Sequence, residues 1–203
     1  MNASESSKAE RILNLLRRQG YIRARDLDAL SVERIYLSRL CEKGLLKKAG
    51  RGIYALADAP VSEWHTLALT AKLVPEGVVC LLSALRFHGI GTQQPHEVWI
   101  ALDRRAATPK PGYPKVRVVR PSGAALSGGV ERHEIEGTPV KIFSAAKTVV
   151  DCFKYRNKIG MDVALEALRE GQRARKFTRE NIWRYAKACR VANVMRPYME
   201  ALA

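Results

Sequence analysis

Apolar residues in the first 60 positions recur every three or four residues and then alternate, which predicts three short helices followed by two strands. The apolar positions from Ile12 to Leu16 suit one face of the first helix, and Gly20 is expected to end it. Ser31 is the expected N-cap of the third helix. The predicted elements are helices over Ala9–Arg18, Ala24–Leu30 and 31–43, then strands over Leu45–Lys48 and Ile53–Leu56 around a glycine turn at 49–52.

Three helices followed by a hairpin with a basic tip are typical of a winged helix-turn-helix, which we predict for residues 1–60. A helical wheel of the third helix separates two sides. The side expected to face the core carries Val32, Ile35, Tyr36 and Leu40. The opposite side carries Arg34, Ser38 and Cys41, with Arg39 at the margin. The packing side and the side available to DNA are therefore distinct.

Basic and hydroxyl side chains on the third helix and the hairpin are the expected DNA contacts. In this class of domain, a helix reads base edges in the major groove, and basic side chains hold phosphates. We expect base or groove contacts from Arg34, Ser38 and Arg39, and phosphate contacts from Lys47, Lys48 and Arg51. The alternative is a winged helix that docks onto another protein, but Lys47 and Lys48 beside the hairpin favour DNA.

Beyond residue 60 the chain alternates between helical and strand patterns, which predicts a second domain over residues 61–203. Ser62 is expected to cap a helix that runs to about Leu73, and Ser144 and Thr178 are expected to cap later helices. The other predicted helices cover Val78–His88, Ala145–Tyr155, Met161–Glu170, Arg179–Arg190 and Pro197–Leu202. The predicted strands cover Glu97–Leu102, Val116–Val119, Arg132–Ile135 and Pro139–Phe143. The predicted fold class is α+β: a winged helix-turn-helix, then a mixed α/β domain that ends in a helical tail.

The charge of the chain is strongly positive, with 35 basic and 20 acidic residues and a net charge of +15. Residues 1–60 hold 12 basic and 7 acidic residues, residues 104–120 hold 6 and none, and residues 169–190 hold 8 and 2. Three basic segments in one small protein favour a polyanionic partner, with nucleic acid ahead of an anionic membrane. In the carboxy-terminal region, the candidate contacts to a nucleic-acid backbone are Arg104, Arg105, Lys110, Lys115, Arg173, Arg175 and Lys176.

Neither a membrane span nor a secretory signal is expected. The longest nearly apolar run, Val78–Leu85, is far shorter than the ~20 residues that a spanning helix needs. The segment from Met1 to Lys8 is polar and lacks the apolar core of a signal peptide. We therefore expect a cytoplasmic protein.

Catalytic and metal-binding patterns are not evident in the sequence, so we expect neither an enzyme nor a cofactor. The four histidines form no pair at helical spacing, and the four cysteines match no zinc or redox spacing. We interpret the cysteines as free thiols. A metal-dependent nuclease is the enzymatic alternative, but Glu134 and Glu136 before Lys141 have the wrong spacing for one.

The order of these segments resembles the AbiEi family of antitoxins from type IV toxin–antitoxin systems. The winged helix with its Gly-Arg-Gly hairpin is similar to the family's amino-terminal domain. Three later segments also resemble the family: the apolar helix Val78–Gly89 that ends in His-Gly, the Ser-x-x-Lys-Thr-x-x-Asp segment Ser144–Asp151, and Gly160–Leu168. We interpret Ser144, Lys147, Thr148 and Asp151 as a structural motif.

The resemblance implies a repressor that acts at inverted repeats in its own operon and counters a nucleotidyltransferase toxin without binding it stably. Composition and spacing do not indicate this second role. Two alternatives stay open: a solitary winged-helix regulator, and an interaction module that grips an acidic toxin directly.

Overall fold

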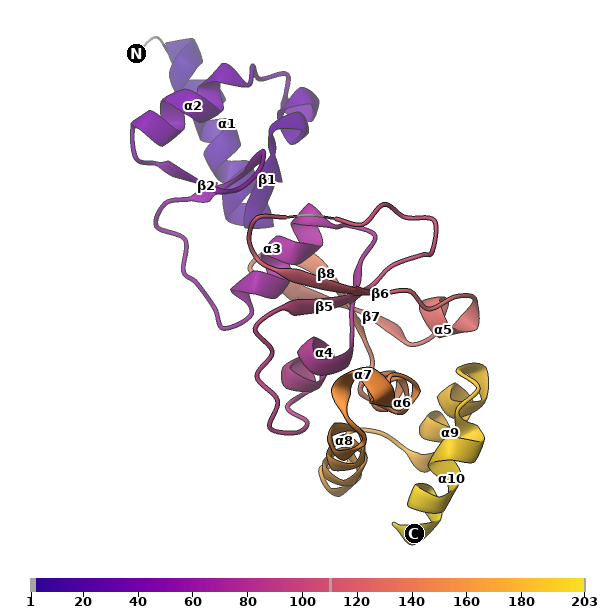
Figure 1. The fold of residues 1–203 in the computed structure, drawn as a ribbon. Coiled ribbons are helices and arrows are strands. Elements are labelled where there is room, and N and C mark those ends of the chain that lie inside the picture. Colours follow the sequence, from indigo (N-terminus) through magenta and orange to yellow (C-terminus); the bar gives the residue numbers. More distant parts are fainter. Residues whose placement is uncertain (1–2, 110, 203) are drawn as a thin grey trace. The chain divides into compact units, whose positions relative to one another are not determined.

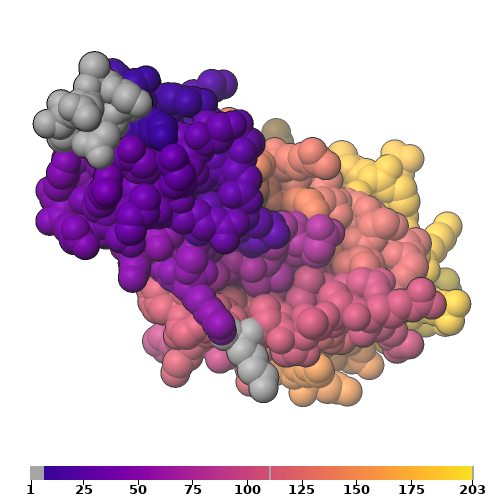
Figure 2. Space-filling model, turned by 90° about the horizontal axis from the view of Figure 1, so that it is seen from above, coloured from indigo at the N-terminus to yellow at the C-terminus, as the bar shows by residue number. Residues whose placement is uncertain are grey.

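The computed structural model describes residues 3–109 and 111–202, and these divide into two compact units (Figure 1). The first unit comprises Met1–Pro75, Lys110–Pro114 and Glu134–Val140, and the second comprises Glu76–Pro109, Lys115–His133 and Lys141–Ala203. The first unit is therefore assembled from three separate stretches of chain. In the space-filling view, the amino-terminal residues, in indigo and purple, form a continuous surface (Figure 2).

The first unit contains a winged helix, in agreement with the prediction. Its sheet has the order β1-β3-β2, and both pairings are antiparallel. The short strand β1 was not predicted, because three residues are too few to show an alternating pattern. The elements are α1 (Ala3–Gln19), β1 (Tyr21–Arg23), the 3-10 helix η1 (Ala24–Leu30), α2 (Ile35–Glu42), β2 (Leu46–Gly50), β3 (Ile53–Leu56) and α3 (His65–Leu73).

Helix α2 begins later than predicted, and this changes the side that it buries. Ser31 does not cap it; this residue closes η1 in a left-handed conformation with φ 51°, and Arg34 is the N-cap. The wheel prediction was therefore wrong for Ile35, which is 55% exposed, whereas Leu37 is buried beside Leu40. The turn at 31–34 interrupts the helical phase, so positions before and after it do not share one continuous wheel.

The core of the first unit comes from the helices and from one face of the sheet. Its buried apolar residues are Ile12, Leu16, Ile22, Leu27, Val32, Leu37, Leu40 and Leu46. Burial of apolar surface stabilises a fold by about 25 cal/mol per Å² removed from water, and burial of this cluster holds the helices against the hairpin.

The second unit combines most of a five-stranded sheet with helices. The sheet order is β6-β5-β4-β8-β7; β4 is antiparallel to β5 and parallel to β8, and β5 is parallel to β6. The strands are β4 (Val78–Val79), β5 (Val98–Ala101), β6 (Val116–Val119), β7 (Val130–Ile135) and β8 (Thr138–Phe143). The helices are α4 (Leu81–His88), α5 (Ala124–Ser127), α6 (Ala145–Lys154), α7 (Arg156–Ile159), α8 (Met161–Arg173), α9 (Arg179–Ala188) and α10 (Ala192–Ala201).

Helix α6 is the centre of the second unit, because it contacts α4, α8 and α9 (Figure 1). As predicted, Ser144 and Thr178 cap α6 and α9 through their side chains. Two predictions were wrong: Val78 and Val79 form a strand before α4, and Trp64, not Ser62, is the N-cap of α3. Among the described residues, no helix combines the length and the apolar composition that crossing a membrane requires.

Candidate nucleic-acid interface

The exposed side of α2 presents four side chains at a spacing of three and four residues: Ile35, Ser38, Arg39 and Glu42. Ser38 and Arg39 are exposed, where the sequence predicted DNA contacts. The Arg39 guanidinium carbon lies 5.4 Å from the centre of the Tyr36 ring, which limits its freedom to swing. Sequence reasoning missed Ile35 as a surface residue, because the apolar pattern placed it in the core.

Arg34 lies at the amino-terminal end of α2 and forms an ion pair with Asp28 of η1. The two side chains are 3.2 Å apart, and both are more than 60% exposed. Exposed ion pairs of this kind contribute about 0–1 kcal/mol. Asp28 is therefore a weak partner that a DNA phosphate or base could replace.

The wing, defined here as β2, β3 and the turn between them, carries the three predicted phosphate contacts Lys47, Lys48 and Arg51. Lys48 and Arg51 are exposed. Lys47 instead donates a hydrogen bond over 3.2 Å to the carbonyl of Ala57, at the far end of the same hairpin. Of the three predicted phosphate contacts, Arg51 at the tip lines the same hollow as Arg34.

Four arginines line one open hollow of about 400 Å³, which we call the arginine hollow: Arg23, Arg25, Arg34 and Arg51. They come from β1, η1, the start of α2 and the tip of the wing. The Arg23 guanidinium donates to the carbonyl of Lys72. Burial and the neighbouring charge of Arg25 lower the pKa of Arg23. Sequence reasoning missed Arg23 and Arg25, although an Arg-x-Arg pair at the start of a helix is a recognisable signal.

The candidate residues of the carboxy-terminal region are exposed in the second unit. Arg104, Arg105 and Lys115 flank an irregular loop, as predicted, and Arg173, Arg175 and Lys176 follow one another at the end of α8. Lys110 lies outside the described residues. Each group is a local basic surface, and no described contact joins the two groups.

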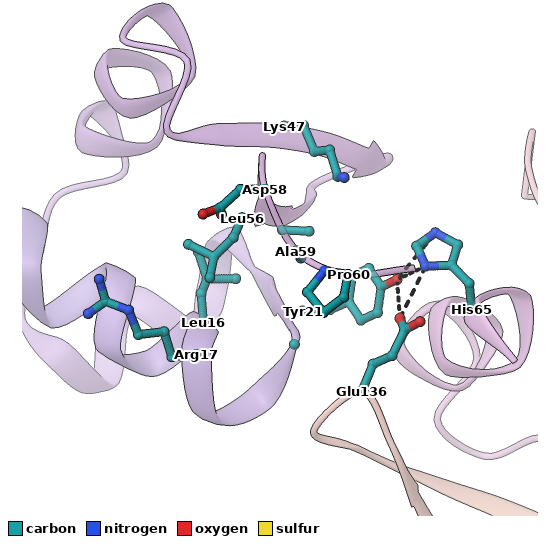
Figure 3. A pocket seen from close by; sticks show the side chains of 12 residues that line it. Leu16, Arg17, Tyr21, Lys47, Leu56, Asp58, Ala59, Pro60, His65 and Glu136 are labelled. Atoms are coloured by element: carbon teal, nitrogen blue, oxygen red, sulfur yellow. Dashed lines mark hydrogen bonds and ion pairs between the residues drawn. The ribbon is translucent and has the colours of Figure 1, made fainter. Parts of the chain in front are cut away.

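A second pocket of the first unit, about 460 Å³ in volume, has a polar end and an apolar wall (Figure 3). At the polar end, the Tyr21 hydroxyl donates to Glu136 over 3.0 Å and lies 2.7 Å from Nδ1 of His65. The backbone N–H and the hydroxyl of Ser62 both donate to Glu136, each over 2.8 Å. Leu16 and Leu56 belong to the wall.

The electrostatics of this pocket favour a structural role. Burial and the hydrogen bond to Glu136 raise the pKa of Tyr21, so the phenol stays protonated. Burial alone would raise the pKa of Glu136, but the hydrogen bonds from Ser62 and Tyr21 hold it below its ordinary value of 4.5. A phenol held neutral beside a stabilised carboxylate is a poor nucleophile. No group of metal-ligating side chains occurs among the described residues.

Acid should destabilise the first unit through Glu136. A carboxyl group with a lowered folded-state pKa stabilises the fold above its unfolded pKa and loses this contribution as the pH falls. We expect the melting temperature of the wild type to drop more steeply below pH 4.5 than that of Glu136→Gln. Glu134→Gln, at an exposed position two residues away, is the control and should follow the wild type.

The Ser144–Asp151 motif is buried in the second unit. Lys147 is fully buried, and its ammonium group lies 2.5 Å from a carboxylate oxygen of Asp151 and 4.0 Å from the centre of the Phe143 ring. The other carboxylate oxygen accepts a hydrogen bond from Cys189 over 3.7 Å. These contacts lie inside the core, as a structural motif requires.

Residues 10–57 match the family model described as "Transcriptional regulator, AbiEi antitoxin". The amino-terminal domain is therefore similar to the AbiEi antitoxin family. The match runs from α1 through β3, so it includes the exposed side of α2, the wing and the four arginines of the hollow. The description as a transcriptional regulator agrees with the predicted class of protein. The likeness of residues 78–168 to the family lies outside the match and stays a prediction. No curated protein matches the chain.

Proposed function

We propose that the chain is a sequence-specific transcriptional repressor that serves as the antitoxin of a type IV toxin–antitoxin system. It represses its own operon at inverted repeats and counters a nucleotidyltransferase toxin without a stable complex. The observation that carries this proposal is that residues matching the AbiEi family model present an exposed Ser38–Arg39 side of α2 and an exposed Arg51 at the tip of the wing. This pairing of a polar helix face with a basic hairpin suits one groove of duplex DNA and its phosphates.

The proposal divides the interface into two parts. Ser38 and Arg39 reach base edges, since they lie on the exposed side of α2. Lys48 and Arg51 hold phosphates, whereas Lys47 supports the wing through Ala57. Arg34 joins the interface once DNA displaces Asp28. The exposed carboxy-terminal cations add contacts to a nucleic-acid backbone.

Arg39 and Lys48 should differ in what they contribute to binding. Arg39→Ala should reduce the preference for the upstream DNA of the operon over a random duplex by roughly 1–3 kcal/mol, because a base contact is lost. Lys48→Ala should weaken binding to both duplexes equally, because a phosphate contact carries no sequence information. Fluorescence anisotropy titrations with the two duplexes at physiological salt measure both effects.

Two outcomes would contradict the repressor function or the division of labour. A wild-type chain that binds the upstream DNA no better than a random duplex would remove the repressor function. Equal losses on both duplexes from Arg39→Ala would remove the base contact but not the regulator.

The antitoxin function is tested by co-expression with the toxin candidate of the same operon. We expect the chain to restore growth, and the two purified proteins to elute separately. A failure to restore growth would leave a solitary regulator, and stable co-elution would favour an interaction module.

A non-enzymatic protein fits the chemistry of its nucleophiles. The cysteines are free, and burial raises the pKa values of Cys80, Cys152 and Cys189, so these thiols stay protonated. Thiolates, not thiols, are the reactive form. The described residues also hold no group of three or more side chains that could bind a metal, so we expect purified protein to cleave neither DNA nor RNA in the presence of a divalent metal.

A further inference from the structure

We propose that the arginine hollow binds one phosphate of the DNA backbone, clasped by Arg25 from η1 and Arg51 from the wing. This inference rests on the proposed DNA-binding function and deepens it. The proposal assigns a role to Arg25, and it makes the helix-turn-helix and the wing two sides of a single site.

Two of the arginines in the hollow have no acidic partner. Among the described residues, no acidic side chain lies within ion-pair distance of Arg25 or Arg51, and both are exposed. Asp26, the nearest acid in sequence, pairs with Lys72 at 3.1 Å. Arg25 and Arg51 thus lie in one hollow without a paired carboxylate, whereas Arg34 is paired with Asp28, and the like charges repel one another. A bound anion relieves this repulsion.

The planar shape of the guanidinium group suits a phosphate. Arginine presents parallel N–H donors that fit two oxygens of one phosphate, and such charge-assisted bonds are about twice as strong as neutral ones. Two exposed guanidinium groups facing one hollow can surround a single phosphate group. Arg23, held by the carbonyl of Lys72, adds a fixed positive charge behind them.

The described lining of the hollow contains no acidic residue. Gly52, Ile53 and Leu73 belong to its lining. These residues carry no charge, so a bound anion meets no carboxylate in the described lining of the hollow. Arg34 lines the same hollow, and its ion pair with Asp28 is exposed. A phosphate in the hollow can therefore displace the Asp28 carboxylate from Arg34.

The salt dependence of DNA affinity tests whether one phosphate is shared. Each phosphate neutralised on duplex DNA contributes roughly −0.9 to the slope of log K against log salt. Because Arg25 and Arg51 clasp the same phosphate, the double variant R25A/R51A should lose roughly 0.9 of slope. Each single variant should weaken binding, and the fold-losses should not multiply. The titrations use the full chain with both the upstream and a random duplex.

Matched variants separate charge from fold. Arg18→Ala removes one exposed arginine of α1 outside the hollow, and its slope should equal that of the wild type. The variant R25K/R51K keeps the charges but loses the paired donors, so it should retain the slope and bind more weakly. Melting temperatures of all variants should stay within a few degrees of the wild type, because both arginines are exposed.

Three results would overturn the proposal. An unchanged slope for R25A/R51A would show that no phosphate sits in the hollow. A loss of roughly 1.8 would mean two separate phosphates. If inorganic phosphate raises the melting temperature of the wild type but not of R25A/R51A, while the slopes stay equal, the hollow binds a free anion instead. A wild type without preference for the upstream DNA would defeat only the repressor function, since the slopes are also measured on the random duplex.

Discussion

Lys147→Met is expected to lower the free energy of unfolding of the second unit by roughly 3–5 kcal/mol, because the carboxylate of Asp151 stays buried without its partner. Burial already raises the pKa of Asp151, and loss of the ammonium group raises it further. The carboxyl group then favours the protonated form in the fold, so the destabilisation should grow as the pH rises above about 4. Urea unfolding, together with amide hydrogen exchange of α6, measures the loss of unfolding free energy in this unit.

The double variant K147M/D151L is the control for this buried pair. Two apolar side chains of similar volume need no charge stabilisation, so most of the lost stability should return. If the double variant is as unstable as the single one, packing around Lys147 matters more than the charge. If Lys147→Met alone is neutral, the ion pair is dispensable and the structural interpretation of the motif is wrong.

Gly20→Ala should destabilise the first unit by more than the roughly 1–2 kcal/mol that a left-handed backbone costs an ordinary residue. Gly20 has φ +66°, and a Cβ at this position would overlap the backbone carbonyl oxygen of Glu136. That oxygen belongs to the β7–β8 turn, which cannot yield as a flexible side chain could. The melting temperature and the amide exchange of β1 should report the loss.

Gly44→Ala is the matched comparison, because Gly44 has φ +68° and a Cβ added there would meet no atom of the described residues within 4 Å. Gly44→Ala therefore has the energetic cost of a left-handed backbone but no overlap of the new Cβ with another atom. The difference between the two variants therefore isolates the contact with the turn. Equal destabilisation would show that the turn moves aside at no cost.

Local patterns predicted many elements well. The strands β3 and β6 and the helix η1 have the predicted bounds, because apolar residues and glycines or prolines mark their ends. The caps at Ser144 and Thr178 followed from local hydrogen bonding. The run from Val78 to Leu85 was wrongly predicted as one helix, since a continuous apolar segment suits both a buried strand and a helix. Only pairing with β5 makes Val78 and Val79 a strand.

The site was less predictable than the fold. The positions of Ser38 and Arg39 on an exposed helix side follow from periodicity. The arginine hollow depends on the approach of the wing tip to η1, although Arg51 follows Arg25 by 26 positions in the chain. The bond between Tyr21 and Glu136 joins residues 115 positions apart. No local pattern in one sequence contains such long-range contacts.

The three-part composition of the first unit sets an order of events during synthesis. The winged helix leaves the ribosome first, but Glu136, which accepts bonds from Tyr21 and Ser62, is translated after β6 and α5. Until then the carboxylate that ties β1 to the segment before α3 does not exist. A nascent chain therefore completes its DNA-binding unit only when nearly half of the second unit has also been made. Reading of DNA by a partial translation product is correspondingly disfavoured.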